Sequence, residues 1–205
     1  DGGEPQEIFD DVLAFRLDPT RTEMVALHLN DEGPVPIGRV ARWRLEEDDS
    51  DTLAVFGLGE QMLETYCVFS DAILFDVDIT GRWVAFAVFD QVMIDPLIEE
   101  ETPTLYLVDT VTESAQRIAE IGFLPSFSPD GRKLAYMTSD DGDTGHAALF
   151  DLETQESAPV PASLGASTCF WLSNSLLGLT YELEDDAYWL VTVDINTGES
   201  AVLVE

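Results

Sequence analysis

Two histidines, His28 and His146, are the side chains of this chain that could act as imidazole bases. Nucleophilic catalysis needs a serine or cysteine within reach of such a base, together with donors that stabilise an oxyanion. The sequence contains no Gly-x-Ser-x-Gly motif, the sharp turn that presents a serine nucleophile. His146 falls at the edge of a predicted loop, where a solvated histidine is the ordinary case. We therefore expect no catalytic serine or cysteine site.

Paired carboxylates are the second kind of candidate chemistry, because one protonated and one ionised carboxyl group can cleave a glycosidic bond. The chain has 41 aspartates and glutamates among 205 residues, so such pairs arise by chance at any spacing. The sialidase-type motif needs Ser-x-Asp-x-Gly, whereas residues 128–131 read Ser-Pro-Asp-Gly and place the glycine one position early. We expect no catalytic residue and no cofactor site.

An acidic segment, Asp141-Gly142-Asp143-Thr144-Gly145, partly imitates a calcium-binding loop. Calcium sites need several oxygen ligands that converge on one point. The segment lacks the bidentate glutamate that closes such a loop, and acidic hairpin loops are common on solvated surfaces. We expect a solvated turn here, with a calcium ion at Asp141 and Asp143 as the alternative.

The two cysteines are Cys67 and Cys169, and neither has a second cysteine at metal-ligand spacing. Free cysteine commonly behaves as a small buried residue. We expect two buried thiols, and a single Cys67–Cys169 disulfide is the alternative.

The net charge excludes several classes of partner. With 41 acidic and 9 basic residues, the formal charge is −32. This charge repels phosphate backbones and anionic lipid headgroups, so we expect neither nucleic-acid binding nor membrane insertion. No apolar run reaches the roughly 20 residues that a membrane helix needs. Lys133 is the only lysine, and acid-rich, lysine-poor surfaces occur both in proteins from saline settings and in exported bacterial proteins.

The structural elements that would position any site repeat along the chain with a period of about forty residues. Residues 127–157 align with residues 170–200 without a gap, with Phe127 on Phe170, and a further copy begins near Asp78. Each copy consists of short apolar and β-branched runs separated by turn residues, which predicts short strands. In the fourth copy the expected strands lie near 124–128, 133–139, 146–152 and 157–161.

Four strands in each repeat of this length are typical of a propeller blade, whose sheet packs its two faces on its neighbours. We therefore predict an all-β, single-domain β-propeller over residues 1–205, with about five four-stranded units that form a ring, an open arc or a fragment. The expected units are 8–40, 41–74, 75–121, 122–164 and 165–205. The second is degenerate and is assembled from segments such as 40–45, 52–58, 65–70 and 72–75, and the first lacks a convincing inner strand.

The turns have a physical basis as well as a pattern. Asp130 supplies a side-chain acceptor and Gly131 can take a positive φ, which suits a tight connection between antiparallel strands. Asn174 is expected to replace that glycine in the last unit. An Asp-x-x-Thr pattern recurs at Asp109, Asp151 and Asp194, where the carboxylate can accept hydrogen bonds from backbone N–H groups of the turn. We expect these aspartates to be structural.

At Phe127-Ser128-Pro129-Asp130-Gly131-Arg132-Lys133-Leu134-Ala135-Tyr136, with Leu149-Phe150-Asp151 following, the sequence resembles the TolB-like, WD-repeat-like β-propeller family. The resemblance is specific in the fourth unit, moderate in the third and fifth, and weak before residue 70. Members of the family mostly have six or seven blades, more than this length allows. The resemblance implies partner binding at the loop faces or at the central funnel.

Blade topology predicts one acidic face, because the connections between second and third strands of successive blades emerge on the same side of a propeller. Three of these connections are acidic, and their candidate interaction residues are Glu99, Glu100, Glu101, Asp140, Asp141, Asp143, Glu184, Asp185 and Asp186. We expect this face to meet a cationic partner or counterions, with simple solubility as the alternative. The insert at 90–98 is expected as a loop tucked on the blade edge, or else exposed as an interface.

The expected function is a non-enzymatic TolB-like module that binds a protein partner or a small ligand at a loop face. One alternative is an accessory propeller of a larger enzyme, such as a prolyl-oligopeptidase-like peptidase. Another is a stand-alone hydrolase or lyase with a central funnel site. The expected location is periplasmic or extracellular, as a processed lipoprotein or secreted bacterial protein, and the alternative is the cytoplasm of a salt-adapted organism.

Overall fold

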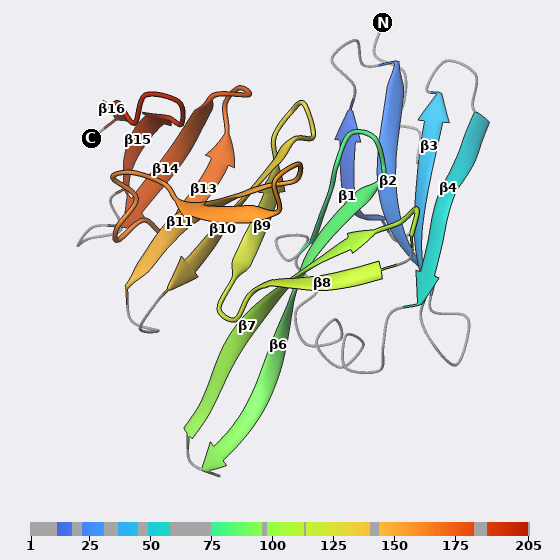
Figure 1. The fold of residues 1–205 in the computed structure, drawn as a ribbon, viewed down its shortest axis with the longest axis horizontal. Helices are drawn as coiled ribbons and strands as arrows, with labels where there is room; N and C mark the ends of the chain where they lie inside the picture. Colours follow the sequence, from blue (N-terminus) through green and yellow to red (C-terminus); the bar gives the residue numbers. More distant parts are fainter. Residues whose placement is uncertain are drawn as a thin grey trace, which may run out of the picture.

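The computed structural model describes residues 12–17, 22–30, 37–44, 49–57, 75–95, 98–112, 114–139, 144–182 and 188–204. These residues form four sheets of four strands each, and within each sheet every strand pairs antiparallel with the next strand of the chain (Figure 1). None of the described residues is helical, and no helix long and apolar enough to cross a membrane occurs among them.

The strand bounds are as follows. The first sheet contains β1 (Val12–Leu17), β2 (Glu23–Asn30), β3 (Ile37–Arg44) and β4 (Asp49–Gly57). The second contains β5 (Phe75–Val77), β6 (Trp83–Asp95), β7 (Ile98–Asp109) and β8 (Ser114–Ala119). The third contains β9 (Phe123–Phe127), β10 (Lys133–Ser139), β11 (Gly145–Asp151) and β12 (Glu156–Pro159). The fourth contains β13 (Thr168–Trp171), β14 (Leu176–Glu182), β15 (Tyr188–Asp194) and β16 (Ser200–Val204).

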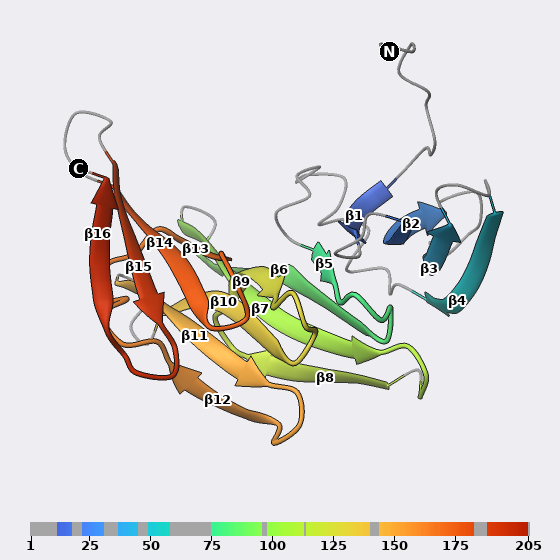
Figure 2. The same cartoon turned by 90° about the horizontal axis from the view of Figure 1, so that it is seen from above.

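The four sheets follow one another as an arc, from β1–β4 at one end to β13–β16 at the other (Figure 2). The first strands of successive sheets touch in order, since β1 contacts β5, β5 contacts β9, and β9 contacts β13. These four strands therefore form the inner edge of the arc. This is the architecture of β-propeller blades in an incomplete propeller, and it confirms the predicted fold class.

The core lies between the sheets, and strand β10 shows how the sequence builds it. Successive side chains of a strand point to opposite faces. Leu134 and Tyr136 pack towards the second sheet against Leu107, whereas Ala135 and Met137 pack towards the fourth. Both faces are buried, which explains why the strand is apolar without alternation. Full burial of a side chain such as Leu134 stabilises the fold by about 1.5–3 kcal/mol.

The strands predicted for the third sheet are confirmed, but the division of the N-terminal part differs from the expectation. Strand β3 runs across the expected boundary between units 8–40 and 41–74 and pairs with both β2 and β4. Two of the segments expected to build a degenerate second unit, 40–45 and 52–58, thus overlap the outer strands β3 and β4 of the first sheet, and the segment 65–70 lies outside the described residues. Strand β1 is the inner strand of that sheet, which corrects the expectation that the first unit lacks a convincing inner strand. The connections between these strands contain no Asp-Gly pair such as the Asp130-Gly131 of the third sheet.

The hairpin between β9 and β10 is closed by side chains, as predicted. Gly131 has a φ of 67°, a conformation that L side chains rarely adopt. The Ser128 hydroxyl oxygen accepts hydrogen bonds from the backbone N–H groups of Arg132 (3.2 Å) and Lys133 (3.0 Å). Asp130 Oδ1 accepts a hydrogen bond from the Ser128 hydroxyl at 2.7 Å. These bonds fix the turn before the core strand begins.

The corresponding turn of the fourth sheet is one residue shorter, so the gapless alignment is wrong at this point. Leu172 N donates to Leu176 O, whereas in the third sheet Ser128 N donates to Lys133 O. Trp171, and not Phe170, therefore occupies the place of Phe127. The shorter turn needs no left-handed residue, and Asn174 does not have the positive φ that was predicted for it.

The recurring aspartates serve the turns after the third strands, as expected. Asp151 Oδ1 accepts from the backbone N–H groups of Glu153 and Thr154, each at 3.0 Å. Asp194 makes the same pair of bonds in the fourth sheet. The Lys133 ammonium lies 2.6 Å from Asp151 Oδ2, and this hydrogen bond is the largest of the interactions that lower the pKa of Asp151 to about 2.

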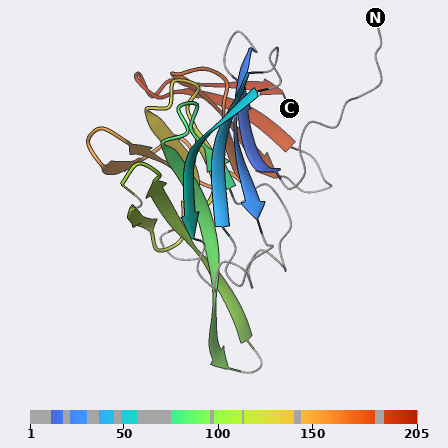
Figure 3. The ribbon, with the colours of Figure 1, turned by 90° about the vertical axis from the view of Figure 1, so that its right-hand side faces the viewer.

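The insert in the second sheet extends a hairpin, which corrects the expectation of a loop. Residues 90–95 belong to β6 and residues 98–101 to β7, and the two strands pair along this stretch. Figure 3 shows the β6–β7 hairpin projecting beyond the ends of the other sheets. The side chains of Met93 and Leu97 lie outside the described residues, so the choice between tucked and exposed residues stays a prediction.

Candidate functional site

A pocket of about 370 Å³ opens at the inner edge of the arc, and we call it the inner-strand pocket. All four inner strands contribute to it, so it depends on the arrangement of the whole arc. The residues that line it are Arg16, Phe75, Asp76, Leu124, Pro125, Ser126, Thr168, Cys169 and Phe170.

Asp76 of β5 holds the charged part of this pocket together. The residue is 6 % exposed, and its carboxylate accepts hydrogen bonds from the backbone N–H groups of Phe127 (2.7 Å) and Val77 (2.9 Å). The Arg16 guanidinium forms an ion pair with Asp76 Oδ2 through Nη2. Arg16 Nη2 also lies 3.4 Å from the Ser126 hydroxyl oxygen. Three sheets therefore meet at one buried carboxylate.

The pKa of Asp76 is raised from 3.8 to about 6. Burial is the largest cause, because a low-dielectric surrounding disfavours the charged form. The positive charge of Arg16 and the hydrogen bonds from the Phe127 and Val77 N–H groups act in the opposite direction and compensate only part of the burial. The carboxyl group therefore takes up a proton in mildly acidic solution.

The walls of the inner-strand pocket are largely apolar. Phe75 is 8 % exposed, and Pro125 is also buried. Phe170 is paired with Gly178 of β14, and its ring is so close that a Cβ at position 178 would stand 2.5 Å from Phe170 Cζ. A glycine is therefore required there for Phe170 to keep its place. Leu124 has a φ of 51°, an uncommon conformation for a leucine.

Cys169 also lines this pocket and is a buried free thiol. Burial raises its pKa to about 12, so the thiol is protonated at neutral pH and is not a nucleophile. Cys67 lies outside the described residues, so its state stays a prediction.

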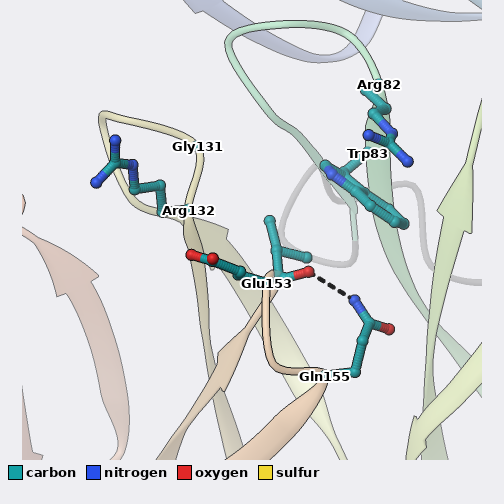
Figure 4. Close-up of a pocket in the computed structure, with 7 residues that line it drawn as sticks. Arg82, Trp83, Gly131, Arg132, Glu153 and Gln155 are labelled. Atoms are coloured by element: carbon teal, nitrogen blue, oxygen red, sulfur yellow. Dashed lines mark hydrogen bonds between the residues drawn. The ribbon is translucent and has the colours of Figure 1, made fainter.

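A second pocket, of about 440 Å³, lies between the second and third sheets at their turns (Figure 4). We call it the rim pocket. The Arg82 guanidinium lies 4.8 Å from the centre of the Trp83 ring and 2.8 Å from Asp109 Oδ2. The hydrogen bond to Asp109 raises the pKa of Arg82. In Figure 4 the side chain of Arg132 extends away from Trp83, so the two arginines of this pocket do not converge on one point.

Most of the acidic residues that were predicted from the sequence to form an interaction face lie outside the residues that the structure describes. Asp140, Asp141, Asp143, Glu184, Asp185 and Asp186 lie outside the described residues, so the calcium site and the acidic face stay predictions. The backbones of Glu99, Glu100 and Glu101 belong to β7, opposite Met93, Val92 and Gln91 of β6, and their side chains are outside the described part. Within the described residues no three His, Cys, Asp or Glu side chains gather as metal ligands would.

The sequence reasoning did not single out Arg16 or Asp76. Each is a charged residue inside an apolar strand segment, Phe15-Arg16-Leu17 and Phe75-Asp76-Val77. Such a placement is the signal that could have identified them, because a buried charge requires a partner. The two residues are 60 positions apart in sequence, so no local motif indicates the pair.

Comparisons with known proteins bear on the fold. No protein-family model matches the sequence, and no curated protein matches it significantly. Solved structures do match in shape. TolB from Acinetobacter baumannii superimposes with a TM-score of 0.58 at 15 % identity, over 100 % of this chain and 47 % of TolB.

Two enzymes are similar as well. The tricorn protease gives a TM-score of 0.55 at 11 % identity, over 93 % of this chain and 22 % of the protease. Oligogalacturonate lyase from Vibrio parahaemolyticus gives 0.54 at 14 % identity, over 92 % of this chain and 52 % of the lyase. This chain thus spans about half the length of TolB and of the lyase. At these identities the likeness concerns architecture, and the chain has a TolB-like β-propeller fold.

Proposed function

We propose that this chain is a non-enzymatic, TolB-like propeller module, exported by a bacterium, that binds a protein partner or a small ligand at the inner-strand pocket. The observation that carries the proposal is the pocket itself, because strands of all four sheets meet there around the Arg16–Asp76 ion pair. Its volume of about 370 Å³ lies within the range of about 300–1,000 Å³ that is usual for ligand sites.

The chemistry of the pocket supports binding over catalysis. Asp76 is engaged by Arg16 and by two backbone N–H groups, which leaves it poorly placed to act as a general base. The Cys169 thiol is protonated, and none of the residues described as lining the pocket is a histidine. Export is part of the proposal because the fold resembles that of TolB, and fractionation of the source cells tests it.

The ligand site can be tested by blocking the pocket. Ser126→Trp places a large side chain in the pocket, whereas Ser200→Trp makes the same change at an exposed position of β16. A library of small molecules is screened against both variants and the unmodified chain by ligand-observed NMR, after circular dichroism has shown that each variant is folded. Ligands lost only in Ser126→Trp support the proposal. Ligands retained in Ser126→Trp show that they bind outside the pocket and refute it, and an empty screen rejects the small-ligand form of the proposal.

A second candidate is an accessory propeller of a larger enzyme, such as a prolyl-oligopeptidase-like peptidase. The likeness to the tricorn protease, of which this chain covers 22 %, favours this candidate. The parent reading frame decides between the two. A reading frame that continues into an α/β-hydrolase domain, past Glu205 or before Asp1, would support the accessory role, and a complete reading frame without such a domain would exclude it.

The likeness to oligogalacturonate lyase supports one enzymatic alternative, in which the chain is a lyase with a central funnel site. Incubation of the purified chain with oligogalacturonate, with and without divalent cations, tests it directly. Turnover that is abolished by Ser126→Trp would overturn the non-enzymatic proposal.

A further inference from the structure

Arg16 is the positively charged residue among those that line the inner-strand pocket. Its hydrogen bonds to described residues, with Asp76 and Ser126, are both donated by Nη2. Nε and Nη1 therefore have no acceptor among the residues that the structure describes. The side chain is 36 % exposed, whereas that of Asp76 is 8 % exposed. The buried carboxylate thus fixes the guanidinium in place, and the remaining donors stay available to a ligand.

A planar guanidinium with free donors is suited to a carboxylate, which it can bind through two parallel N–H···O bonds. The neighbouring walls favour an apolar group beside that carboxylate, because Phe75, Pro125 and Phe170 line the same pocket. Gly178 leaves the space beside β14 that the Phe170 ring occupies, and so keeps that wall in position.

The charge of the chain limits the ligand further. A formal charge of −32 disfavours the approach of ligands with several negative charges. When Asp76 is ionised, it balances the charge of Arg16, and the pair as a whole is neutral. A single carboxylate on an apolar body is the anion that this arrangement tolerates best.

We propose that the inner-strand pocket binds a small monocarboxylate with an aryl or alkyl body, whose carboxylate contacts Arg16 and whose body lies between Phe75 and Phe170. This inference rests on the proposed function, in which the pocket is a ligand site, and adds the chemical class of the ligand.

Binding of such a ligand is coupled to the protonation of Asp76. The charged and titratable side chains described around Asp76 are Arg16 from β1 and the neutral Cys169 thiol from β13, and β9 contributes only the Ser126 hydroxyl and the Phe127 N–H. A second carboxylate beside Asp76 favours its protonated form. Affinity should therefore rise as the pH falls towards the pKa of Asp76, which is about 6.

The experiment compares phenylacetate with phenylacetamide, a neutral probe of nearly the same shape. Their dissociation constants for the whole chain are measured by NMR titration at about pH 7.5 and about pH 5.5, where phenylacetate is still mostly ionised. We expect phenylacetate to bind at least about tenfold more tightly than the amide, because charge-assisted bonds are the stronger ones. We also expect its affinity to be several-fold higher at the lower pH.

Arg16→Gln removes the proposed anion contact, and Arg132→Gln is the matched control because it removes the same charge from an exposed residue outside the pocket. The first change should weaken phenylacetate binding by about tenfold or more, and the second should leave it unchanged. If Arg16→Gln fails to fold, phenylacetate binding by Asp76→Asn tests the inference instead. Its permanently neutral side chain leaves Arg16 unbalanced, so binding should tighten at neutral pH and lose its pH dependence.

Two results would overturn the inference. Equal binding of acid and amide, unaffected by Arg16→Gln, would show that Arg16 does not select a carboxylate, although the pocket would still be a ligand site if Ser126→Trp abolished both. Absence of phenylacetate binding would reject the carboxylate class, and the library screen on Ser126→Trp then decides separately whether the proposed function survives.

Discussion

Replacement of Asp76 by asparagine tests the electrostatics of the inner-strand pocket through the stability of the chain. The asparagine side chain has nearly the same shape but does not titrate, so it stays neutral in the folded and the unfolded chain. The carboxyl group of Asp76 has a pKa of about 6 when folded and an ordinary value of 3.8. Only the original protein therefore exchanges a proton at this position between pH 3.8 and about 6.

The sign follows from the raised pKa. Between these two values the folded chain binds the proton more tightly than the unfolded chain, so folding is favoured at low pH and loses free energy as the pH rises. The pKa rises from 3.8 to about 6, and each tenfold change in proton affinity is worth about 1.4 kcal/mol. The stability of the original protein relative to Asp76→Asn should thus fall by about 3 kcal/mol in total as the pH rises through this window, and most of the fall should occur between about pH 4 and about pH 7.

Urea denaturation at several pH values and one ionic strength measures this difference. The four tryptophans provide the fluorescence signal. All other carboxylates titrate in both proteins, so their contributions and the general repulsion at −32 cancel when the two free energies of unfolding are subtracted. The comparison is valid if the free energy of unfolding falls with urea concentration at the same slope in the two proteins.

A difference in stability that is constant from about pH 4 to about pH 7 would refute the reasoning, because it would show that Asp76 has the same proton affinity folded and unfolded. A difference that grows with pH would show the opposite, an Asp76 held ionised by Arg16 more strongly than burial opposes it.

Three further predictions concern packing and charge. Gly178→Ala should destabilise the chain by about 1–3 kcal/mol, because its Cβ would stand 2.5 Å from Phe170 Cζ; urea melts of the single variants and of the Gly178→Ala, Phe170→Leu double variant should show most of this cost relieved by the smaller side chain. Leu134→Ala should cost about 2–5 kcal/mol because Leu134 is 0 % exposed, whereas Leu164→Ala, at a residue 72 % exposed, should cost little in the same assay. The melting temperature should rise with sodium chloride if counterions stabilise the acidic face, and with calcium if residues 141–143 bind it; a flat response to both would leave solubility as the role of the charge.

The parts of the fold that could be predicted from the sequence are those in which nearby turn residues determine where each strand begins and ends. Asp130 and Gly131 indicate a tight turn, and Asp151 indicates the turn after a third strand, so the strands between them were placed to within a residue or two. Residues 12–57 lack these turn residues. The four strands of the first sheet were therefore divided between two units, although their hairpin order is the same as in the later sheets.

The inner-strand pocket could not be predicted, because its parts meet only after the sheets have been placed side by side. Arg16 and Asp76 are 60 residues apart and belong to different sheets. Among 41 acidic residues, a single aspartate carries no sign of burial unless its strand is known to lie at the inner edge. The acidic loops can be identified from composition alone, whereas the Arg16–Asp76 ion pair depends on the three-dimensional arrangement of the sheets.

The packing of β10 on both of its faces predicts the order in which the sheets unfold. Each interior sheet shares one interface with the sheet before it and one with the sheet after it, so its strands are released only when both interfaces open. The fourth sheet presents Tyr188, Trp189, Val202 and Leu203 to solvent at exposures between 42 % and 57 %. Opening should therefore proceed from the ends of the arc, and backbone amides of Leu134 to Met137 should exchange with deuterium more slowly than those of Val191 to Val202.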